Sequence, residues 1–319
     1  MTAGAQRSEV KVIGGVPWTR NTRQDLKWVL LFLAPWIIGF VVLTAGPMLW
    51  TLYLSFTNYN PISQNVHFIG LDNYERMLRD RHVINSLYNT LFYTVLHVPL
   101  SMGIALFLAL MLNRIGGRSA GFFRTAFYVP NLTPAVAVGT LFLMLLNGNS
   151  GLVNQALGML GIDGPSWLND PAWVKPGIII MSLWTVGNTV VIYFAALKNV
   201  PIELYEAARI DGANAWQQFR KVTVPMISGA LFFTFIINTI ASLQLFTEVY
   251  TMFFGQQQGQ SSGAGQAALF YVIYLFQQAF GVFRMGYASA LAWLLFVVIV
   301  IITVIQVRVS RRFVFYEGE

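Results

Sequence analysis

The sequence predicts an all-α integral membrane protein with six transmembrane helices. Of its 319 residues, 56% are hydrophobic and only 10% are charged, and the mean hydropathy is +0.59. A soluble domain carries about 25% charged residues, so these side chains are too few to cover a globular surface in water. Six apolar stretches are each long enough to cross a bilayer, which takes about 20 residues. The basic residues also fall mainly on one side of these stretches.

The first predicted span follows a polar, basic segment, and we expect it to remain in the mature protein. Its apolar run is too long for the core of a signal peptide, and it shows no clear small-residue cleavage site. We therefore expect a disordered or weakly helical tail over 1–27, a transmembrane domain over 28–310 and a second tail over 311–319. The six spans are predicted at Trp28–Phe56, Leu87–Leu112, Phe123–Leu146, Lys175–Leu197, Val222–Phe253 and Met285–Val307.

Two shorter segments belong to the outer loops of this arrangement. A turn followed by a short amphipathic helix is predicted over Phe68–Leu78. The segment Ala267–Phe280 is apolar but too short for a span, and we expect an interfacial or re-entrant helix on the outer side. Prolines such as Pro130 and Pro134 lie inside a predicted span, which is tolerated where neighbouring helices satisfy the backbone.

The distribution of charge orients the spans. Basic residues are enriched in cytoplasmic loops of membrane proteins. With both termini in the cytoplasm, 15 of the 20 Lys and Arg residues lie on the inner side. They are Arg7, Lys11, Arg20, Arg23, Lys27, Arg114, Arg118, Arg124, Lys198, Arg209, Arg220, Lys221, Arg308, Arg311 and Arg312. This orientation puts the polar loop over 200–225 in the cytoplasm.

That loop is built for contact with another protein. Pro201 suits the first turn of a helix, where the missing N–H costs nothing. Glu206 lies toward the positive end of the helix dipole, and Asp211-Gly212 is a turn signal. A second amphipathic run follows before Pro225, where the next span begins. The pattern predicts two short helices joined by a glycine turn, between two membrane spans.

The loop also resembles a known motif. Glu206-Ala207-Ala208, then Gly212, then Val222-Thr223-Val224-Pro225 is similar to the EAA motif of binding-protein-dependent ABC importer permeases. That motif has three residues between E-A-A and G, and nine between G and I-x-L-P. The spacing here is the same, with Val in place of Ile and Leu. The flanking residues resemble the carbohydrate branch, which includes maltose and glycerol-phosphate permeases.

The resemblance implies the type I ABC importer permease fold with a cytoplasmic coupling helix, in the inner membrane of a bacterium. It implies four kinds of partner: a second related permease, two copies of a cytoplasmic ATPase, an extracytoplasmic solute-binding protein and a carbohydrate. ATP and Mg²⁺ would be bound by the ATPase subunits, and no cofactor by this chain. The residues implied in coupling are Tyr205, Glu206, Ala207, Ala208, Asp211, Gly212 and Pro225.

Neutral polar residues within the spans are the candidates for solute binding. Asn238 and Ser242 are four apart and share a helix face, as do Gln244 and Glu248. They could bind a sugar, or they could join helices at about 0.6–2 kcal/mol each. The resemblance, in which the helices flanking the EAA loop line the pocket, gives the solute-binding candidates Trp184, Asn188, Asn238, Ser242 and Gln244. For His97, inside the second span, we expect a structural hydrogen bond.

Catalytic motifs are missing from the sequence. It contains no G-x-x-x-x-G-K-[ST] phosphate loop, no H-E-x-x-H and no cysteine. The chain is therefore expected to draw its energy from a partner, which makes it a transport subunit and not an enzyme. The rival functions are a stand-alone carrier or channel, and a membrane-embedded enzyme or scaffold. Glu248, near the outer end of its span, is the one intramembrane acid, which argues against an ion-coupled carrier. The solute stays open among saccharides, polyols and glycerol-3-phosphate, the last disfavoured because no Arg or Lys lies within a span.

Overall fold

The computed structural model describes residues 12–13, 16–17, 20–63, 66–115, 117–254 and 265–310. These residues form an all-α protein, which confirms the predicted fold class. The exception is a hairpin of two-residue strands, β1 (Val12–Ile13) and β2 (Val16–Pro17), in the predicted N-terminal tail. By length and composition, four helices can cross a membrane, or six if each of two bent helix pairs is counted as one span.

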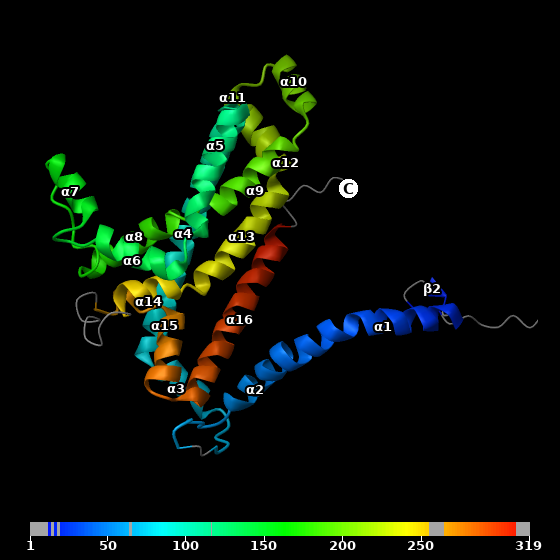
Figure 1. Ribbon diagram of the computed structural model, residues 1–319, viewed down its shortest axis with the longest axis vertical. Coiled ribbons are helices and arrows are strands. Elements are labelled where there is room, and N and C mark those ends of the chain that lie inside the picture. The colour runs from blue at the N-terminus through cyan, green and yellow to red at the C-terminus, as the bar shows by residue number, and fades with distance from the viewer. Residues whose placement is uncertain are drawn as a thin grey trace, which may run out of the picture.

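The first span is made of α1 (Arg20–Phe40), the π-helical turn η1 (Val41–Ala45) and α2 (Gly46–Leu54). The π turn lies just before Gly46-Pro47, and Pro47 has no N–H to donate to the preceding turn. Figure 1 shows α1 projecting away from the other helices, and none of its most apolar window is buried. This apolar surface must be covered by lipid or by another protein.

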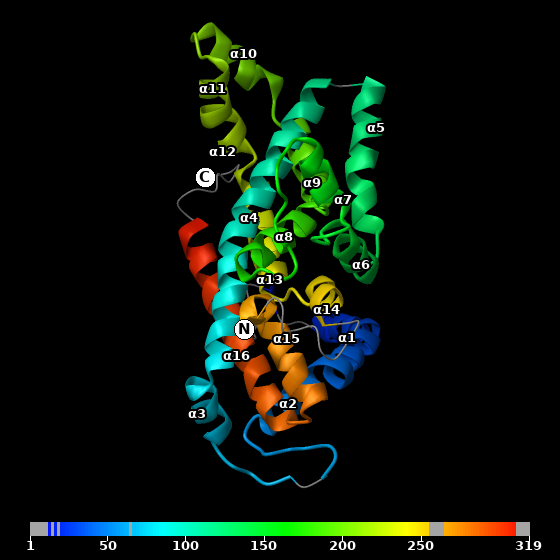
Figure 2. The same ribbon diagram turned by 90° about the vertical axis from the view of Figure 1, so that its left-hand side faces the viewer.

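The long helices α4 (Arg81–Ile115) and α16 (Met285–Ser310) match two predicted spans. Figure 2 shows α4 running from α3 (Asp72–Arg79) to the start of α5. It packs against α9, α13 and α15 on the way. The predicted fifth span is α13 (Ser228–Leu243) followed by α14 (Thr247–Phe253). Helix α4 is therefore the central element of the bundle.

Two predicted spans are bent pairs of helices. The third consists of α5 (Gly117–Tyr128), η2 (Val129–Leu132) and α6 (Ala135–Leu145), with a bend of 96°. The fourth consists of α8 (Pro171–Leu183) and α9 (Gly187–Lys198), with a bend of 50°. The first bend coincides with Pro130 and Pro134, which remove backbone donors and end the preceding helical turn. The sequence located these stretches but not their bends.

The two ends of the molecule carry different short elements. Toward one end lie α3, η5 (Gly265–Ala268), α15 (Tyr271–Phe276) and η6 (Gln277–Gly281), whereas α7 (Leu152–Met159) projects sideways beyond α6 and α8. At the other end lie α10 (Ile202–Ile210), α11 (Ala215–Gln218), η3 (Phe219–Thr223) and α12 (Val224–Met226). The predicted amphipathic helix over 68–78 and the predicted docking helix are both present.

The apolar segment over 267–280 lies inside the bundle. Phe270, Tyr271 and Ile273 are fully buried, and α15 packs against both α4 and α16. Of the two placements expected from the sequence, this burial favours a re-entrant segment over a helix at the membrane surface.

Candidate functional site

A cavity of about 430 Å³ opens in the middle of the spans. Its walls come from α4, α6, α8, α9, α13 and α14, so segments far apart in the chain meet there. Its lining residues are Tyr93, His97, Ser101, Val138, Met181, Ser182, Thr185, Val186, Thr189, Asn238, Ala241, Ser242, Gln244, Leu245, Phe246, Thr247 and Glu248. We refer to it as the central pocket.

Three of the five predicted solute-binding residues line this pocket: Asn238, Ser242 and Gln244. Glu248, in the first turn of α14, lines the pocket as well. It is half-buried. The helix face shared by Asn238 and Ser242 thus points into a cavity, whereas Gln244 and Glu248 do not share a face on one helix, because α13 ends at Leu243.

The other two predicted residues, Trp184 and Asn188, are not among the residues that line the pocket. The Trp184 ring packs edge-on against Phe142, with 6.1 Å between ring centroids. The backbone N–H of Asn188 donates to the side-chain oxygen of Asn131. Both are exposed in this chain. They lie on either side of the break between α8 and α9, which turns them away from the cavity.

The pocket also contains residues that the sequence analysis did not assign to it, above all Tyr93 and His97 on α4. The Tyr93 hydroxyl donates to Ser182 Oγ at 2.7 Å. The ring of His97 stacks on Tyr93, with 4.9 Å between centroids and 8° between planes. His97 Nδ1 lies 3.1 Å from Ser242 Oγ. The predicted structural hydrogen bond of His97 is therefore present, but the same ring faces the cavity.

Two polar atoms of the pocket are left without a partner in the described structure. They are His97 Nε2 and Asn238 Nδ2, both buried. A buried polar atom that makes no hydrogen bond costs about 1–3 kcal/mol, so such atoms mark places where a ligand or water belongs. Among the described lining residues none is Lys or Arg, and Glu248 is the single carboxylate. The pocket can hold a neutral polar solute by hydrogen bonds.

The predicted coupling residues lie at the end of the molecule that carries α10. Tyr205 to Ala208 are on α10, and Asp211 caps its C-terminus. Gly212 has φ +76°, and the N–H of the next residue, Ala213, donates to Ala208 at 2.9 Å. Glycine reaches this left-handed conformation without the penalty of a Cβ. Pro225 lies in the first turn of α12, as expected where a helix restarts.

Helix α10 presents an exposed surface that no other described part of the chain covers. None of its residues is buried, and Ile210 is 86% exposed. The Tyr205 hydroxyl lies 3.0 Å from Thr223 Oγ1, which ties α10 to η3. Between them is a hollow of about 650 Å³ that also reaches the end of α4 at Arg114. The helix is thus held at its base and free on its outer face.

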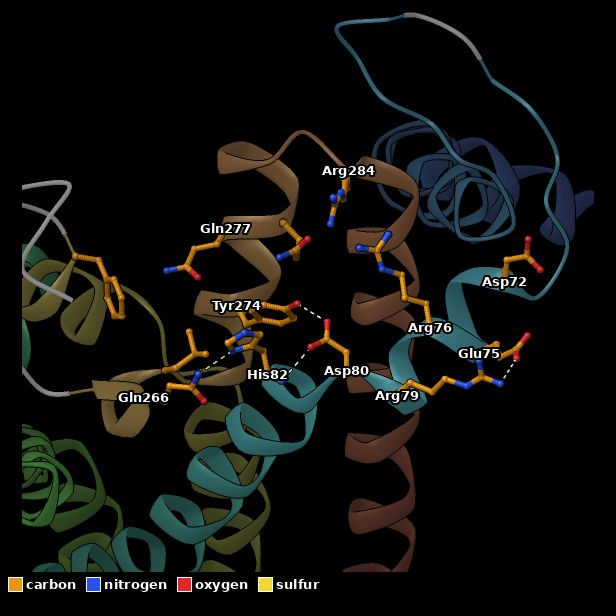
Figure 3. A pocket seen from close by; sticks show the side chains of 13 residues that line it. Asp72, Glu75, Arg76, Arg79, Asp80, His82, Gln266, Tyr274, Gln277 and Arg284 are labelled. Atoms are coloured by element: carbon orange, nitrogen blue, oxygen red, sulfur yellow. Dashed lines mark hydrogen bonds and ion pairs between the residues drawn. The ribbon is translucent and has the colours of Figure 1, made fainter. Parts of the chain in front are cut away.

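A larger cleft, of about 1070 Å³, lies at the opposite end of the molecule (Figure 3). We refer to it as the Asp80 cleft. Asp80 accepts hydrogen bonds there from the hydroxyls of Tyr274 and Tyr287. Burial raises the pKa of Asp80, but these two hydrogen bonds and one from the His82 N–H outweigh it, so the pKa lies below its ordinary value. The cleft is open and rimmed by charged side chains, including Arg76, Arg79 and Arg284, which suits contact with a protein better than passage through a membrane.

Comparison with known proteins agrees with this arrangement. The probable ABC transporter permease protein YesP of Bacillus subtilis is 36% identical over 303 residues, which cover 94% of this chain and 96% of that protein. The lactose transport system permease protein LacF of Rhizobium radiobacter is 34% identical, covering 88% of this chain and 93% of its own length. The arabinooligosaccharides transport system permease protein AraP of B. subtilis is 30% identical, with 89% and 88% covered.

Solved structures give the same result. The chain is similar to a bacterial ABC transporter involved in the import of the acidic polysaccharide alginate, with TM-score 0.79, 25% identity, and 92% and 99% of the two chains covered. The same transporter was solved with an alginate pentasaccharide-bound periplasmic protein. Residues 101–315 match the family model described as "Binding-protein-dependent transport system inner membrane component". Since this match spans well over half of the chain, the protein belongs to the family of binding-protein-dependent transport system inner membrane components.

Proposed function

We propose that this chain forms half of the pathway by which an ATP-driven importer moves a neutral carbohydrate across a bacterial cytoplasmic membrane. The chain is a permease subunit and not an enzyme. One observation carries the proposal: the central pocket lies between the two spans that lead into and out of the α10 loop, and Glu248 is the one charged side chain among its hydrogen-bonding described lining residues. Solute and driving force thus act on the same pair of spans.

The proposed solute is a neutral saccharide or polyol, held by Asn238, Ser242 and Gln244. The absence of Lys and Arg among the described lining residues argues against glycerol-3-phosphate, whose phosphate would be desolvated without a counter-charge. The names of several relatives specify lactose, arabinooligosaccharides and starch degradation products. A panel of lactose, arabinotriose and maltotriose is therefore the first set to test.

The proposed coupling runs through α10. We place its exposed face in a cleft of one of two cytoplasmic ATPase subunits, which bind ATP and Mg²⁺. Glu206 would make polar contacts there, while Tyr205 and Ala208 hold α10 against its own chain. Closure of the ATPase dimer would move α10 and, through η3 and α12, the spans around the central pocket. This is a physically connected two-state element of the kind that coupling requires.

A second, related permease is the proposed partner within the membrane. It would supply the other half of the pathway and cover part of α1, whose apolar length makes almost no contact with its own bundle. The solute-binding protein would dock at the end of the molecule that carries the Asp80 cleft, opposite α10.

Purification from native membranes tests the assembly. A tagged chain should bring with it an ABC ATPase and a second permease of similar length. Recovery of this chain alone in a transport-competent form would favour a stand-alone carrier instead. The complex, reconstituted with its solute-binding protein, should import at least one member of the saccharide panel when ATP is present and none when ATP is absent.

Labelling tests the orientation, in which both termini and the 200–225 loop are cytoplasmic. The chain has no cysteine, so single cysteines can be introduced at exposed sites without a background signal. Gln217→Cys on α11 should react only after the membrane is permeabilised, and Ser63→Cys at the opposite end should react in intact cells. The reverse labelling pattern would show that the chain has the opposite orientation in the membrane.

A further inference from the structure

We propose that His97 contacts the transported solute directly, donating a hydrogen bond from Nε2 to an oxygen of the saccharide. This inference rests on the proposed function for the nature of the solute. It goes further in adding a third wall to the binding site, because His97 lies on α4 and not on the two spans that flank the α10 loop.

The first argument is rigidity. His97 is one helical turn from Tyr93, and its ring lies almost parallel to the Tyr93 ring. Tyr93 itself is 1% exposed and is anchored by its hydrogen bond to Ser182 on α8. The imidazole is therefore held in one orientation before any solute arrives. A side chain that is already ordered loses little conformational entropy when it binds.

The second argument is the position of the ring proton. Within the described part of the chain, His97 Nδ1 is the one hydrogen-bond partner of the Ser242 hydroxyl. If the hydroxyl donates to Nδ1, its proton has an acceptor and the imidazole carries its own proton on Nε2. If Nδ1 donates instead, the hydroxyl proton has no acceptor. We therefore assign the Nε2–H tautomer, which makes His97 a donor toward the pocket.

The third argument is the unmet donor itself. Nε2 is buried and has no partner in the described structure, and neither has the Asn238 Nδ2 group on the facing helix α13. A purely structural histidine in a membrane helix would normally have both ring nitrogens satisfied. Two buried donors in one cavity are instead suited to the oxygen atoms of a solute. Glu248 in the same lining offers an acceptor for a solute hydroxyl.

The experiment compares His97→Ala, His97→Gln and His67→Ala in the complete transporter with its solute-binding protein. His67 is a matched control, because it is an exposed histidine outside the pocket. The readouts are the maximal uptake rate of the transported panel saccharide, the rates of its monodeoxy analogues, and the ATPase activity stimulated by the binding protein. The affinity of the binding protein itself is unchanged by these variants, so maximal rates are compared.

We expect His97→Ala to lower the maximal uptake rate about 5- to 10-fold, which corresponds to the loss of one hydrogen bond. His97→Gln, which keeps an N–H near the position of Nε2, should recover at least part of that loss. His67→Ala should match the wild type. The wild type should transport one monodeoxy analogue more slowly than the parent saccharide, because that analogue lacks the oxygen that His97 Nε2 contacts. His97→Ala should transport this analogue and the parent saccharide at equal rates. A residue that merely packs would slow all analogues alike.

The possible results distinguish failure of this inference from failure of the proposed function. If the assembled His97→Ala complex transports the saccharide and every analogue at wild-type rates, the inference is wrong while the proposed function stands. The inference is also wrong if His97→Gln and His97→Ala lower the maximal uptake rate equally and do so by the same factor for every analogue. That pattern would indicate a packing defect. If the wild type transports no carbohydrate at all, the proposed function fails and this inference fails with it.

Discussion

The hydroxyl of Tyr287 donates a hydrogen bond to Asp80 at 2.8 Å, joining α16 to the residue that precedes α4. The hydroxyl of Tyr274, on α15, donates to the same carboxylate oxygen, Asp80 Oδ2. Residues about 200 positions apart in the sequence are thereby joined at one end of the bundle (Figure 3). A single partly buried carboxylate holds three helices in register.

Asp80→Asn is expected to destabilise the detergent-solubilised protein. The amide keeps one acceptor oxygen but loses its charge, and hydrogen bonds to charged groups contribute about 1.5–3 kcal/mol. Tyr287→Phe removes one of the two hydroxyls and should cost less. Thermal unfolding at neutral pH measures both. Equal unfolding temperatures for the wild type and Asp80→Asn would show that the carboxylate contributes no net stability.

The same carboxylate makes a prediction about pH. The pKa of Asp80 in the folded protein lies below its ordinary value of 3.8. A lowered pKa means that the stabilisation is complete above the unfolded value and is lost as the pH falls through the folded one. The advantage of the wild type over Asp80→Asn should thus be constant from neutral pH down to about 5, and should shrink below about pH 4. An advantage that instead faded between pH 7 and 5 would contradict this assignment.

Much of the fold follows from local patterns. The six spans were located from apolar length, and α10 from its proline, its acids and the glycine turn after it. The sequence does not reveal which spans are bent, or by what angle. Pro130 and Pro134 are tolerated in straight and broken spans alike, so nothing local fixes the 96° bend between α5 and α6.

The central pocket could likewise be predicted only in part from local sequence patterns. The spacing of Asn238 and Ser242 identified a shared face, but only tertiary contact shows that α4 supplies the facing wall with Tyr93 and His97. The spacing of Gln244 and Glu248 predicts a second shared face on a continuous helix, yet α13 ends at Leu243 and α14 begins at Thr247. Helical spacing does not carry across such a break. The hydrogen bonds around Asp80 join residues too distant in sequence for any local pattern to predict.

Gly212→Asp should produce a transporter that assembles but does not couple. A Cβ at position 212 would have open space around it, so the cost lies in the backbone at φ +76°, which Asp tolerates better than most residues but not as well as Gly, and in the second negative charge placed beside Asp211. Gly229→Ala is a matched control, since it also has open space but no positive φ. We expect Gly212→Asp to lose most uptake and most ATPase stimulation while co-purifying with the ATPase. Wild-type uptake and ATPase stimulation in this variant would show that α10 does not transmit movement from the ATPase to the spans.

Gly187→Ala should disrupt the contact between two bent spans. A Cβ at this position would lie 1.8 Å from the carbonyl oxygen of Phe127, a backbone atom that cannot rotate away. Helices α5 and α9 would have to separate, and overpacking of this kind costs about 1–3 kcal/mol or more. Gly121→Ala on α5 has open space and serves as the control. The expected readout is a lower yield of folded protein on gel filtration for Gly187→Ala alone.

Tyr205→Phe and Thr223→Val test whether the bond between α10 and η3 transmits movement. Each variant removes one partner of the 3.0 Å hydrogen bond and leaves the exposed face of α10 unchanged. We expect each to reduce binding-protein-stimulated ATPase activity about 2- to 5-fold, and the double variant to be no worse than either single one, because both remove the same interaction. Additive losses would mean that the two residues act separately.

Asn238→Ala and Asn188→Ala give the sharpest test of the boundary of the central pocket. The substitutions are chemically identical, and both positions were predicted to bind solute. Asn238 lines the pocket with an unpartnered Nδ2, whereas Asn188 is exposed away from it and meets Asn131 through its backbone. Loss of the Asn238 amide should therefore slow saccharide uptake about 5- to 10-fold with assembly intact, since one hydrogen bond to the solute is lost. Asn188→Ala should change uptake less than twofold by the same reasoning. If Asn188→Ala has the larger effect, the solute passes outside the cavity described by this chain alone, along a surface completed by the second permease.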